Sequence, residues 1–269
     1  MVGSFDTVAH TELKEMLNQR IGDGVIRRLV SKWLHAGVWE MGGVSYPGKG
    51  TPQGGVISPL LSNIYLHEVL DKWFEEQVKP LLKGRAFMVR YADDFVMGFE
   101  SRRDADRVLQ VLGKRLARFG LELHAGKTRM VDFHPSGRDG TGGSFDFLGF
   151  THTWRMSRKG RPYVCRTTEK SRFGRALGKM KAYLMKTLNH PLPEQRIGLV
   201  RRLEGHYNYY GLIGNSKALG RFLVEVQKQW LESLRRRSGH HANRWTWQRF
   251  NRMLEQQPLP RPMIMTAKV

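Results

Sequence analysis

This chain of 269 residues has a single cysteine and no long apolar run. One thiol, Cys165, excludes intrachain disulfides, cysteine-rich zinc sites and dithiol redox motifs, so we expect it to be buried and inert. No segment approaches the ~20 consecutive apolar residues of a membrane span, and charged side chains interrupt the first thirty residues, where a secretory leader would need an apolar core. The sequence therefore predicts a soluble, cytoplasmic protein with no membrane partner.

Acidic residues are scarce in the second half of the chain. Residues 1–150 hold 20 basic and 18 acidic side chains, a net charge of +2, whereas residues 151–269 hold 25 basic and 6 acidic, a net charge of +19. A field of this density attracts polyanions, because each phosphate that it neutralises releases counterions. A basic surface that only confers solubility is the alternative. Aromatic residues interleaved with the basic ones favour a nucleic acid as the partner.

The spacing of apolar residues changes between the two halves of the chain. In the first half it predicts helices over residues 11–20, 25–35, 58–82 and 105–116, and strands over 38–46, 87–90, 95–99, 121–123, 129–133 and 145–152. Residues 154–167 indicate a basic hairpin, and helical periodicity follows from residue 169 onward. We predict an α+β fold with a mixed domain over residues 1–154 and a mostly helical, basic domain over residues 155–269.

A glycine-rich loop directly precedes the longest helical pattern. Gly54 and Gly55 permit close backbone approach ahead of the helix N-terminus, and the amide of Gln53 can donate and accept hydrogen bonds. These features suit a nucleotide or a template strand lying over the loop. A turn followed by a helix cap uses the same residue types and stays open as the alternative.

Two adjacent carboxylates follow in the sequence Tyr91-Ala92-Asp93-Asp94, between the two apolar strands of the middle region. Carboxylate oxygens at a tight turn suit a hard divalent cation such as Mg²⁺. An acidic pair in a turn is common, so by itself it indicates a solvated hairpin tip. The glycine-rich loop upstream makes a nucleotide-handling site the stronger interpretation.

Several motifs occur in an ordered series along the chain. They are residues 5–10 (FDTVAH), 51–61 (TPQGGVISPLL), 91–94 (YADD), 120–124 (GLELH) with Lys127 and Thr128, and 147–150 (FLGF). In this order they resemble the palm motifs of the bacterial group II intron reverse transcriptase/maturases. Residues 203–215, which include HYNYY, resemble the maturase-specific thumb signature of the same family. The resemblance runs from residue 3 nearly to the C-terminus.

The resemblance implies a reverse transcriptase palm in residues 1–154, an antiparallel sheet with packed helices, and a thumb or maturase-specific (X) domain in residues 155–269. The implied activity is RNA-directed DNA polymerisation, a nucleotidyl transfer from dNTPs to a DNA primer on an RNA template. Binding of group II intron RNA for splicing and retrotransposition accompanies it. Asp93 and Asp94 would hold Mg²⁺ in a two-metal site, and Lys127 would assist the leaving pyrophosphate.

Further site residues carry over to matching positions. Contacts with the nucleotide or template would come from Phe5, Gln53, Gly54, Tyr91 and Ala92. Phe147, Leu148, Gly149 and Phe150 would form the primer grip. The expected RNA contacts are Arg158, Lys159, Arg172, Arg175, Arg201, Arg202, His206, Tyr209, Arg235, Arg236 and Arg237. For residues 206–210, a packed corner of the core is an equally good interpretation.

One acid of the family's metal site is expected outside these 269 residues. The first palm motif of the family places an aspartate five residues before Phe5, immediately upstream of Met1, and the fingers segments further upstream. Asp6 lies roughly 20 Å from that position along an extended chain, so it cannot simply substitute. We therefore expect an incomplete copy with low polymerase activity.

Three functions stay open from the sequence. A polymerase that also aids splicing accounts for the ordered palm motifs. An RNA-binding splicing factor without polymerase activity accounts for the missing acid and the basic second half. An inert fragment of a mobile element would show neither activity.

Overall fold

The computed structural model describes residues 10–35, 38–40, 43–45, 56–135, 142–237 and 245–265. The chain forms two compact units, Met1–Met130 and Val131–Val269, each with its own hydrophobic core. Helices and short antiparallel sheets make up both, which confirms the α+β prediction. Of the described helices, none combines the length and the apolar composition that crossing a bilayer requires.

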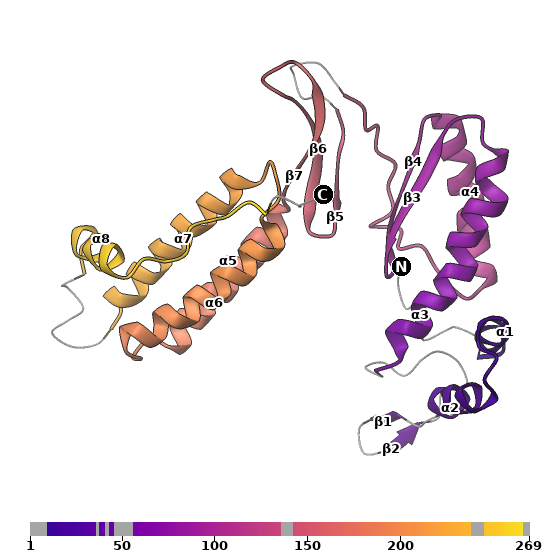
Figure 1. The fold of residues 1–269 in the computed structure, drawn as a ribbon, viewed down its shortest axis with the longest axis horizontal. Coiled ribbons are helices and arrows are strands. Elements are labelled where there is room, and N and C mark those ends of the chain that lie inside the picture. The colour runs from indigo at the N-terminus through magenta and orange to yellow at the C-terminus, as the bar shows by residue number, and fades with distance from the viewer. Residues whose placement is uncertain are drawn as a thin grey trace. The chain divides into compact units, whose positions relative to one another are not determined.

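The first unit holds most of the predicted helices and the central hairpin (Figure 1). Its elements are α1 (His10–Arg20), α2 (Gly24–Leu34), β1 (Val38–Glu40), β2 (Gly43–Ser45), α3 (Ser58–Leu66), β3 (Ala86–Tyr91), β4 (Asp94–Phe99) and α4 (Arg102–Arg118). The β1–β2 and β3–β4 pairs are each antiparallel. The stretch predicted as extended over residues 38–46 is thus a short hairpin.

The helix predicted over residues 58–82 is present, with a winding that the sequence did not indicate. It begins as α3, with Pro59 in the first turn, where a missing N–H costs nothing. It continues as the π-helical segments η1 (His67–Asp71) and η2 (Trp73–Val78) and ends in the 3₁₀ turn η3 (Lys79–Leu81). Such wide turns are rare and frequently mark functional sites.

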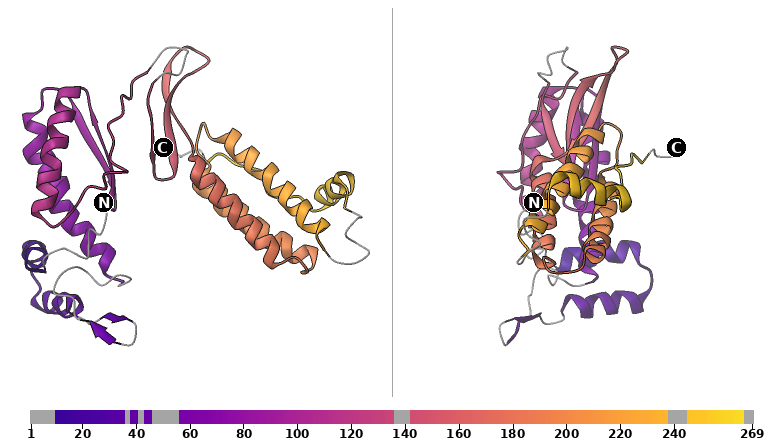
Figure 2. Two further views of the ribbon diagram at one scale, coloured as in Figure 1. Left: turned by 180° about the vertical axis from the view of Figure 1, so that it is seen from behind. Right: turned by 90° about the vertical axis from the view of Figure 1, so that its left-hand side faces the viewer.

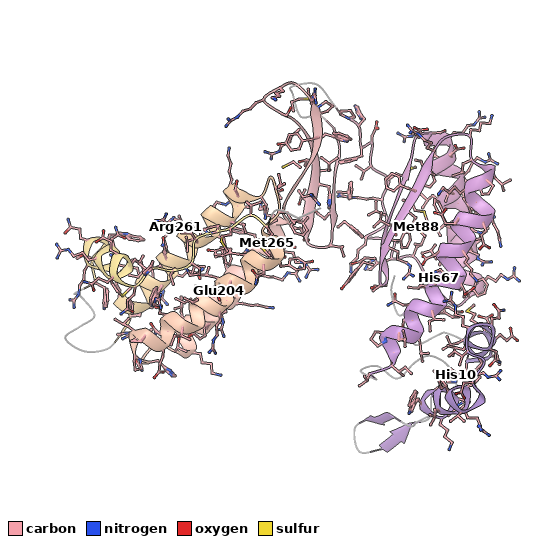
Figure 3. All side chains as sticks on the ribbon, viewed as in Figure 1. His10, His67, Met88, Glu204, Arg261 and Met265 are labelled. Carbon is pink, nitrogen blue, oxygen red and sulfur yellow. The ribbon has the colours of Figure 1, made fainter. Side chains whose placement is uncertain are left out.

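The core of the first unit is formed by this long helix, α1, α2, α4 and one face of the β3–β4 hairpin. Ser101 caps α4, and a stripe of buried side chains at four-residue spacing faces the core: Val108, Leu112 and Leu116. Strand β3 alternates, since Ala86 is buried and Met88, labelled in Figure 3, packs against the core. Its other face exposes Phe87, Val89 and Tyr91.

Two strands expected after α4 are wrong. The described residues 121–135 contain no strand. Leu121 is buried because it follows the end of α4, where its N–H donates to the Leu116 carbonyl at 2.9 Å. Residues 129–133 are exposed or half-buried loop residues, so the alternation of apolar side chains there does not reflect a sheet.

The second unit joins a three-stranded sheet to a helical bundle. Its elements are β5 (Ser144–Phe147), β6 (Phe150–Met156), β7 (Pro162–Thr168), α5 (Lys170–Lys186), α6 (Leu192–Tyr210), α7 (Ser216–Arg235) and α8 (Trp247–Gln256). The sheet is antiparallel in the order β5-β6-β7, and the pairing of Met156 with Pro162 confirms the hairpin predicted over residues 154–167. The single strand expected at 145–152 is instead broken by a turn at Leu148 and Gly149.

Helices α5, α6 and α7 run side by side, as the two further views in Figure 2 show. Their facing sides bury apolar residues, and Phe250 of α8 closes one end by packing edge-on against Trp230 with ring centroids 5.5 Å apart. The side chain of Gln195 is fully buried and accepts a hydrogen bond from the Trp230 indole at 2.9 Å. Cys165 is buried as expected, with Sγ 3.8 Å from the Gly214 carbonyl oxygen.

Candidate functional site

The acidic pair lies at the turn of the β3–β4 hairpin. Tyr91 pairs with Asp94, so Ala92 and Asp93 form a two-residue turn. Ala92 has a φ of 52°, the left-handed region that a side chain disfavours, and such positive φ matches the right-handed twist of the flanking strands. The turn therefore holds two consecutive carboxylates at one end of a rigid apolar hairpin.

The donor set fits a hard divalent cation. No basic nitrogen of the described residues lies within 4.0 Å of the Asp93 or Asp94 carboxylate, so their oxygens are not used in ion pairs. Within the described part of the chain, no cluster of three or more His, Cys, Asp or Glu side chains could hold a metal. One or two carboxylates are nevertheless the usual protein ligands of Mg²⁺, which keeps waters and binds substrate phosphates.

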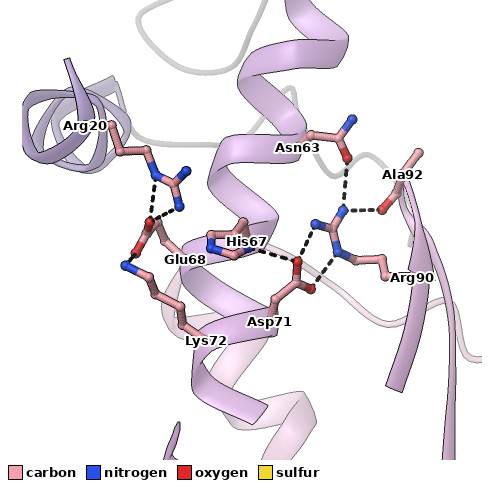
Figure 4. Close-up of polar contacts among 8 residues, drawn as sticks. All are labelled: Arg20, Asn63, His67, Glu68, Asp71, Lys72, Arg90 and Ala92. Carbon is pink, nitrogen blue, oxygen red and sulfur yellow. Dashed lines mark hydrogen bonds and ion pairs between the residues drawn. The ribbon is translucent and has the colours of Figure 1, made fainter. Parts of the chain in front are cut away.

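A network around Arg90 connects this turn to the long helix (Figure 4). The Arg90 guanidinium donates to Asp71 through Nε at 2.7 Å and Nη2 at 2.6 Å, while Nη1 donates to Asn63 Oδ1 at 3.0 Å. The same Nη1 donates to the Ala92 carbonyl oxygen at 2.9 Å. Arg90, Asp71 and Asn63 were not predicted from the sequence, because none of them belongs to a recognised motif.

The other residues expected near nucleotide and template differ in what the structure says of them. Phe5, Gln53 and Gly54 lie outside the described residues. Tyr91 is 67% exposed on the outer face of β3, beside the acidic turn. Lys127 is exposed in a turn where its N–H donates to the His124 carbonyl at 3.0 Å, and it contacts neither carboxylate.

The expected primer-grip residues form the turn between β5 and β6. Phe147 pairs with Phe150, and the two residues between them have positive φ, 51° at Leu148 and 77° at Gly149. A Cβ on Gly149 would lie 3.0 Å from the Tyr210 hydroxyl oxygen, so glycine is required both by the backbone and by this neighbour.

The end of α6 packs onto this turn. The Tyr209 hydroxyl donates to the Leu148 carbonyl oxygen at 2.9 Å, and its ring stacks on Phe150 with centroids 5.8 Å apart. Tyr210 also contacts the Phe150 ring, at 5.2 Å between centroids. The structure thus brings together two motifs 61 residues apart, an arrangement that the sequence did not predict.

His206 is a half-buried aromatic residue in the second core. Its ring stacks on Phe222 with centroids 3.8 Å apart, and burial lowers its pKa to about 4. The imidazole is therefore neutral at pH 7 and brings no positive charge to a phosphate. Burial likewise raises the pKa of the neighbouring Tyr207 phenol.

The basic residues expected to contact RNA fall into two groups. Some already have partners: Arg172 with Glu169, Arg175 with Ser171, Arg202 with the Gly198 carbonyl, Arg235 with the Trp245 carbonyl and Arg237 with the His190 carbonyl. Others form no side-chain hydrogen bond or ion pair with described residues, and all are exposed: Arg158, Lys159, Arg201 and Arg236. The second group can bind phosphates without breaking an internal hydrogen bond.

Comparisons with known proteins match the same regions. Residues 1–152 match the family model described as reverse transcriptase (RNA-dependent DNA polymerase). Protein YkfC of Escherichia coli K12 is 32% identical over 212 residues, covering 68% of this chain and 53% of that protein. Group II intron-encoded protein LtrA of Lactococcus lactis is 36% identical over 129 residues, covering 48% of this chain and 21% of LtrA.

A eukaryotic protein is similar over more of the chain. The putative COX1/OXI3 intron 2 protein of Saccharomyces cerevisiae is 24% identical over 285 residues, covering 83% of this chain and 30% of that protein. The chain thus spans about half the length of YkfC and smaller parts of the other two relatives.

Proposed function

Because this chain belongs to the reverse transcriptase family, in its group II intron-encoded branch, we propose that it acts in RNA-directed DNA synthesis and in splicing of its intron RNA. The observation that carries the proposal is the Asp93–Asp94 turn, which lies within the matched region and whose carboxylates form no ion pair with the described residues. The association with an intron is proposed from a relative, because LtrA is named as a group II intron-encoded protein. The cytoplasm is the proposed place of action.

The proposed reaction is nucleotidyl transfer. The primer 3′-hydroxyl gives its proton to water, and its oxygen forms a bond to the α-phosphorus of a dNTP. The bond between the α-phosphorus and the oxygen that bridges to the β-phosphate breaks, and pyrophosphate leaves with that electron pair. A bound Mg²⁺ pair, when present, would activate the hydroxyl and neutralise the leaving group. Asp93 and Asp94 are the proposed metal ligands of this chain, and Lys127 is proposed to stabilise the leaving pyrophosphate.

The primer end is proposed to lie against the turn at Leu148 and Gly149. This turn belongs to the second unit, so the proposed palm, residues 1–154, includes part of both units. The contacts of Tyr209 and Tyr210 with the turn support an arrangement in which the thumb helix α6 fixes the shape of the primer grip.

Intron RNA and the RNA template are the proposed partners of the second unit. Residues 131–269 hold 26 basic and 9 acidic side chains, a net charge of +17, against +4 for residues 1–130. The exposed tip of the β6–β7 hairpin and the helical bundle carry basic residues that form no side-chain hydrogen bond or ion pair within the described part of the chain, among them Arg158, Lys159, Arg201 and Arg236. Binding dominated by such contacts weakens steeply with salt.

A splicing factor without polymerase activity is the second candidate. It is favoured by the absence, within the described residues, of a third metal-ligating side chain beside Asp93 and Asp94. Primer extension and intron splicing, measured side by side with the wild-type chain and Asp93→Asn, separate the candidates. If the wild-type chain performs both reactions and Asp93→Asn loses only synthesis, the polymerase is supported. If the wild-type chain performs splicing alone, the second candidate is supported.

A further inference from the structure

We propose that Arg90 is a positioning residue that holds the Ala92–Asp94 turn in one conformation, with Asp71 as its anchor and its charge partner. The inference rests on the proposed function in one respect, namely that the turn carries two metal-binding carboxylates whose geometry Arg90 fixes. The claim that Arg90 holds the turn depends only on the contacts of its guanidinium.

The conformation of the Ala92–Asp94 turn requires stabilising contacts from outside the turn. Ala92 occupies a left-handed conformation that residues with a side chain disfavour, and among the described strands β3 and β4 pair only with each other. The Arg90 side chain reaches past the end of its own strand and donates to the Ala92 carbonyl oxygen at 2.9 Å. This bond fixes the peptide that joins Ala92 to Asp93.

The other groups that bind the Arg90 guanidinium lie on the long helix. Asp71, the last residue of η1, accepts two nearly parallel bonds from Arg90, and Asn63 of α3 accepts a third. The Arg90 side chain is only 11% exposed, so water competes little with these bonds. The guanidinium therefore connects the long helix to the peptide beside Asp93 and restricts the movement of that peptide.

Asp71 also cancels the charge of Arg90. An arginine beside a cation site would repel a divalent ion unless an acid neutralised it, and the ion pair at 2.6 Å does so. His67 Nδ1 lies 3.3 Å from the Asp71 carboxylate on its other side, so the carboxylate is held from two directions. A lysine at position 90 would keep the charge but could not reproduce the fork, the Asn63 bond and the Ala92 bond at once.

The test compares hydrogen exchange of the turn amides with affinity for Mn²⁺, a paramagnetic probe that carboxylates bind, in the full 269-residue chain. The variants are Arg90→Lys, Asp71→Asn and the milder Asn63→Ala. Arg85→Lys is the control, because Arg85 lies next to the same strand and pairs through Nε and Nη2 with Oε1 of Glu100 at the far end of the hairpin. Asp93→Asn marks binding at the acidic turn.

We expect Arg90→Lys and Asp71→Asn to speed exchange at residues 92–94 and to weaken Asp93-dependent Mn²⁺ binding by roughly 10-fold or more, the usual effect of losing a residue that orients a metal ligand. Asn63→Ala should do the same to a smaller degree, and Arg85→Lys should do neither. Exchange at the turn that is the same in Arg90→Lys, Asp71→Asn and Arg85→Lys would overturn the proposal.

Failure of the proposed function gives a different result. If Asp93→Asn leaves Mn²⁺ affinity unchanged, the acidic turn is not a metal site and the proposed catalysis loses its carboxylates. The exchange rates still decide whether Arg90 holds the turn, because they are measured without metal.

Discussion

At the scale of single residues, Gly149 combines a positive φ with a close neighbour. Alanine there must adopt a φ near 77° and place its Cβ 3.0 Å from the Tyr210 hydroxyl, whereas Gly160, with a φ of 70°, has open space around it. We predict that Gly160→Ala costs about 1 kcal/mol of unfolding free energy and Gly149→Ala about 2 kcal/mol or more. Urea unfolding of both variants measures the difference, and equal costs would show that the contact with Tyr210 imposes nothing.

His206 predicts a dependence of stability on pH. Its pKa is about 4 in the folded chain, because of burial, and 6.5 when free. Between these values the unfolded chain binds more protons, so stability is lost as the pH falls from about 6.5 toward 4. His206→Phe keeps a ring against Phe222 and should remove part of this loss, measured as urea midpoints from pH 7 to 4. Parallel profiles for wild type and variant would contradict the buried, neutral imidazole.

At the scale of elements, the β6–β7 hairpin should be a phosphate-binding element. Arg158 and Lys159 are exposed at its tip, and neither side chain forms a hydrogen bond or ion pair with a residue that the structure describes. Replacing both with glutamine should lower the slope of log affinity for structured RNA against log salt by about two, roughly one for each phosphate that the hairpin no longer neutralises. The control is Arg102→Gln with Arg103→Gln at the exposed start of α4, which removes the same charge from the first unit. Equal slopes in the two double variants would show that only total charge matters.

Local patterns predicted the elements better than they predicted the winding and the contacts. The β3–β4 hairpin was predictable because two apolar strands flank a two-residue turn. The π-helical winding of residues 67–78 was not, since its buried residues fit ordinary helical spacing equally well. Leu121 was assigned to a strand because burial of a loop residue produces the same apolar signal as burial of a strand residue.

Most of the site residues that the sequence did not predict form polar contacts with residues far away along the chain. Arg90 and Asp71 are 19 residues apart, and Tyr209 and Leu148 are 61 apart. Neither separation follows from the period of a helix or a strand, because the pairs form only after the elements have packed. The acidic pair, the turn at Leu148 and Gly149 and the basic hairpin could be located from motifs, while the contacts of Arg90 with Asp71 and the acidic turn, and of Tyr209 with Leu148, could not.

At the scale of the whole molecule, we assign metal binding to the first unit and most RNA binding to the second. The two assignments depend on different properties, carboxylates at a turn and a net charge of +17 over residues 131–269, so either can fail alone. The polymerase assignment is the more demanding one, because two metal ions near a triphosphate need carboxylates from separate strands.

Primer extension on an RNA template is the measurement that tests the central claim most directly. It compares the wild-type polypeptide with Asp93→Asn at the same primer, template and Mg²⁺ concentrations. We predict dNTP incorporation by the wild type that Asp93→Asn lowers by orders of magnitude, because the variant loses a proposed metal ligand. Equal rates of synthesis in the wild type and in Asp93→Asn would contradict the account.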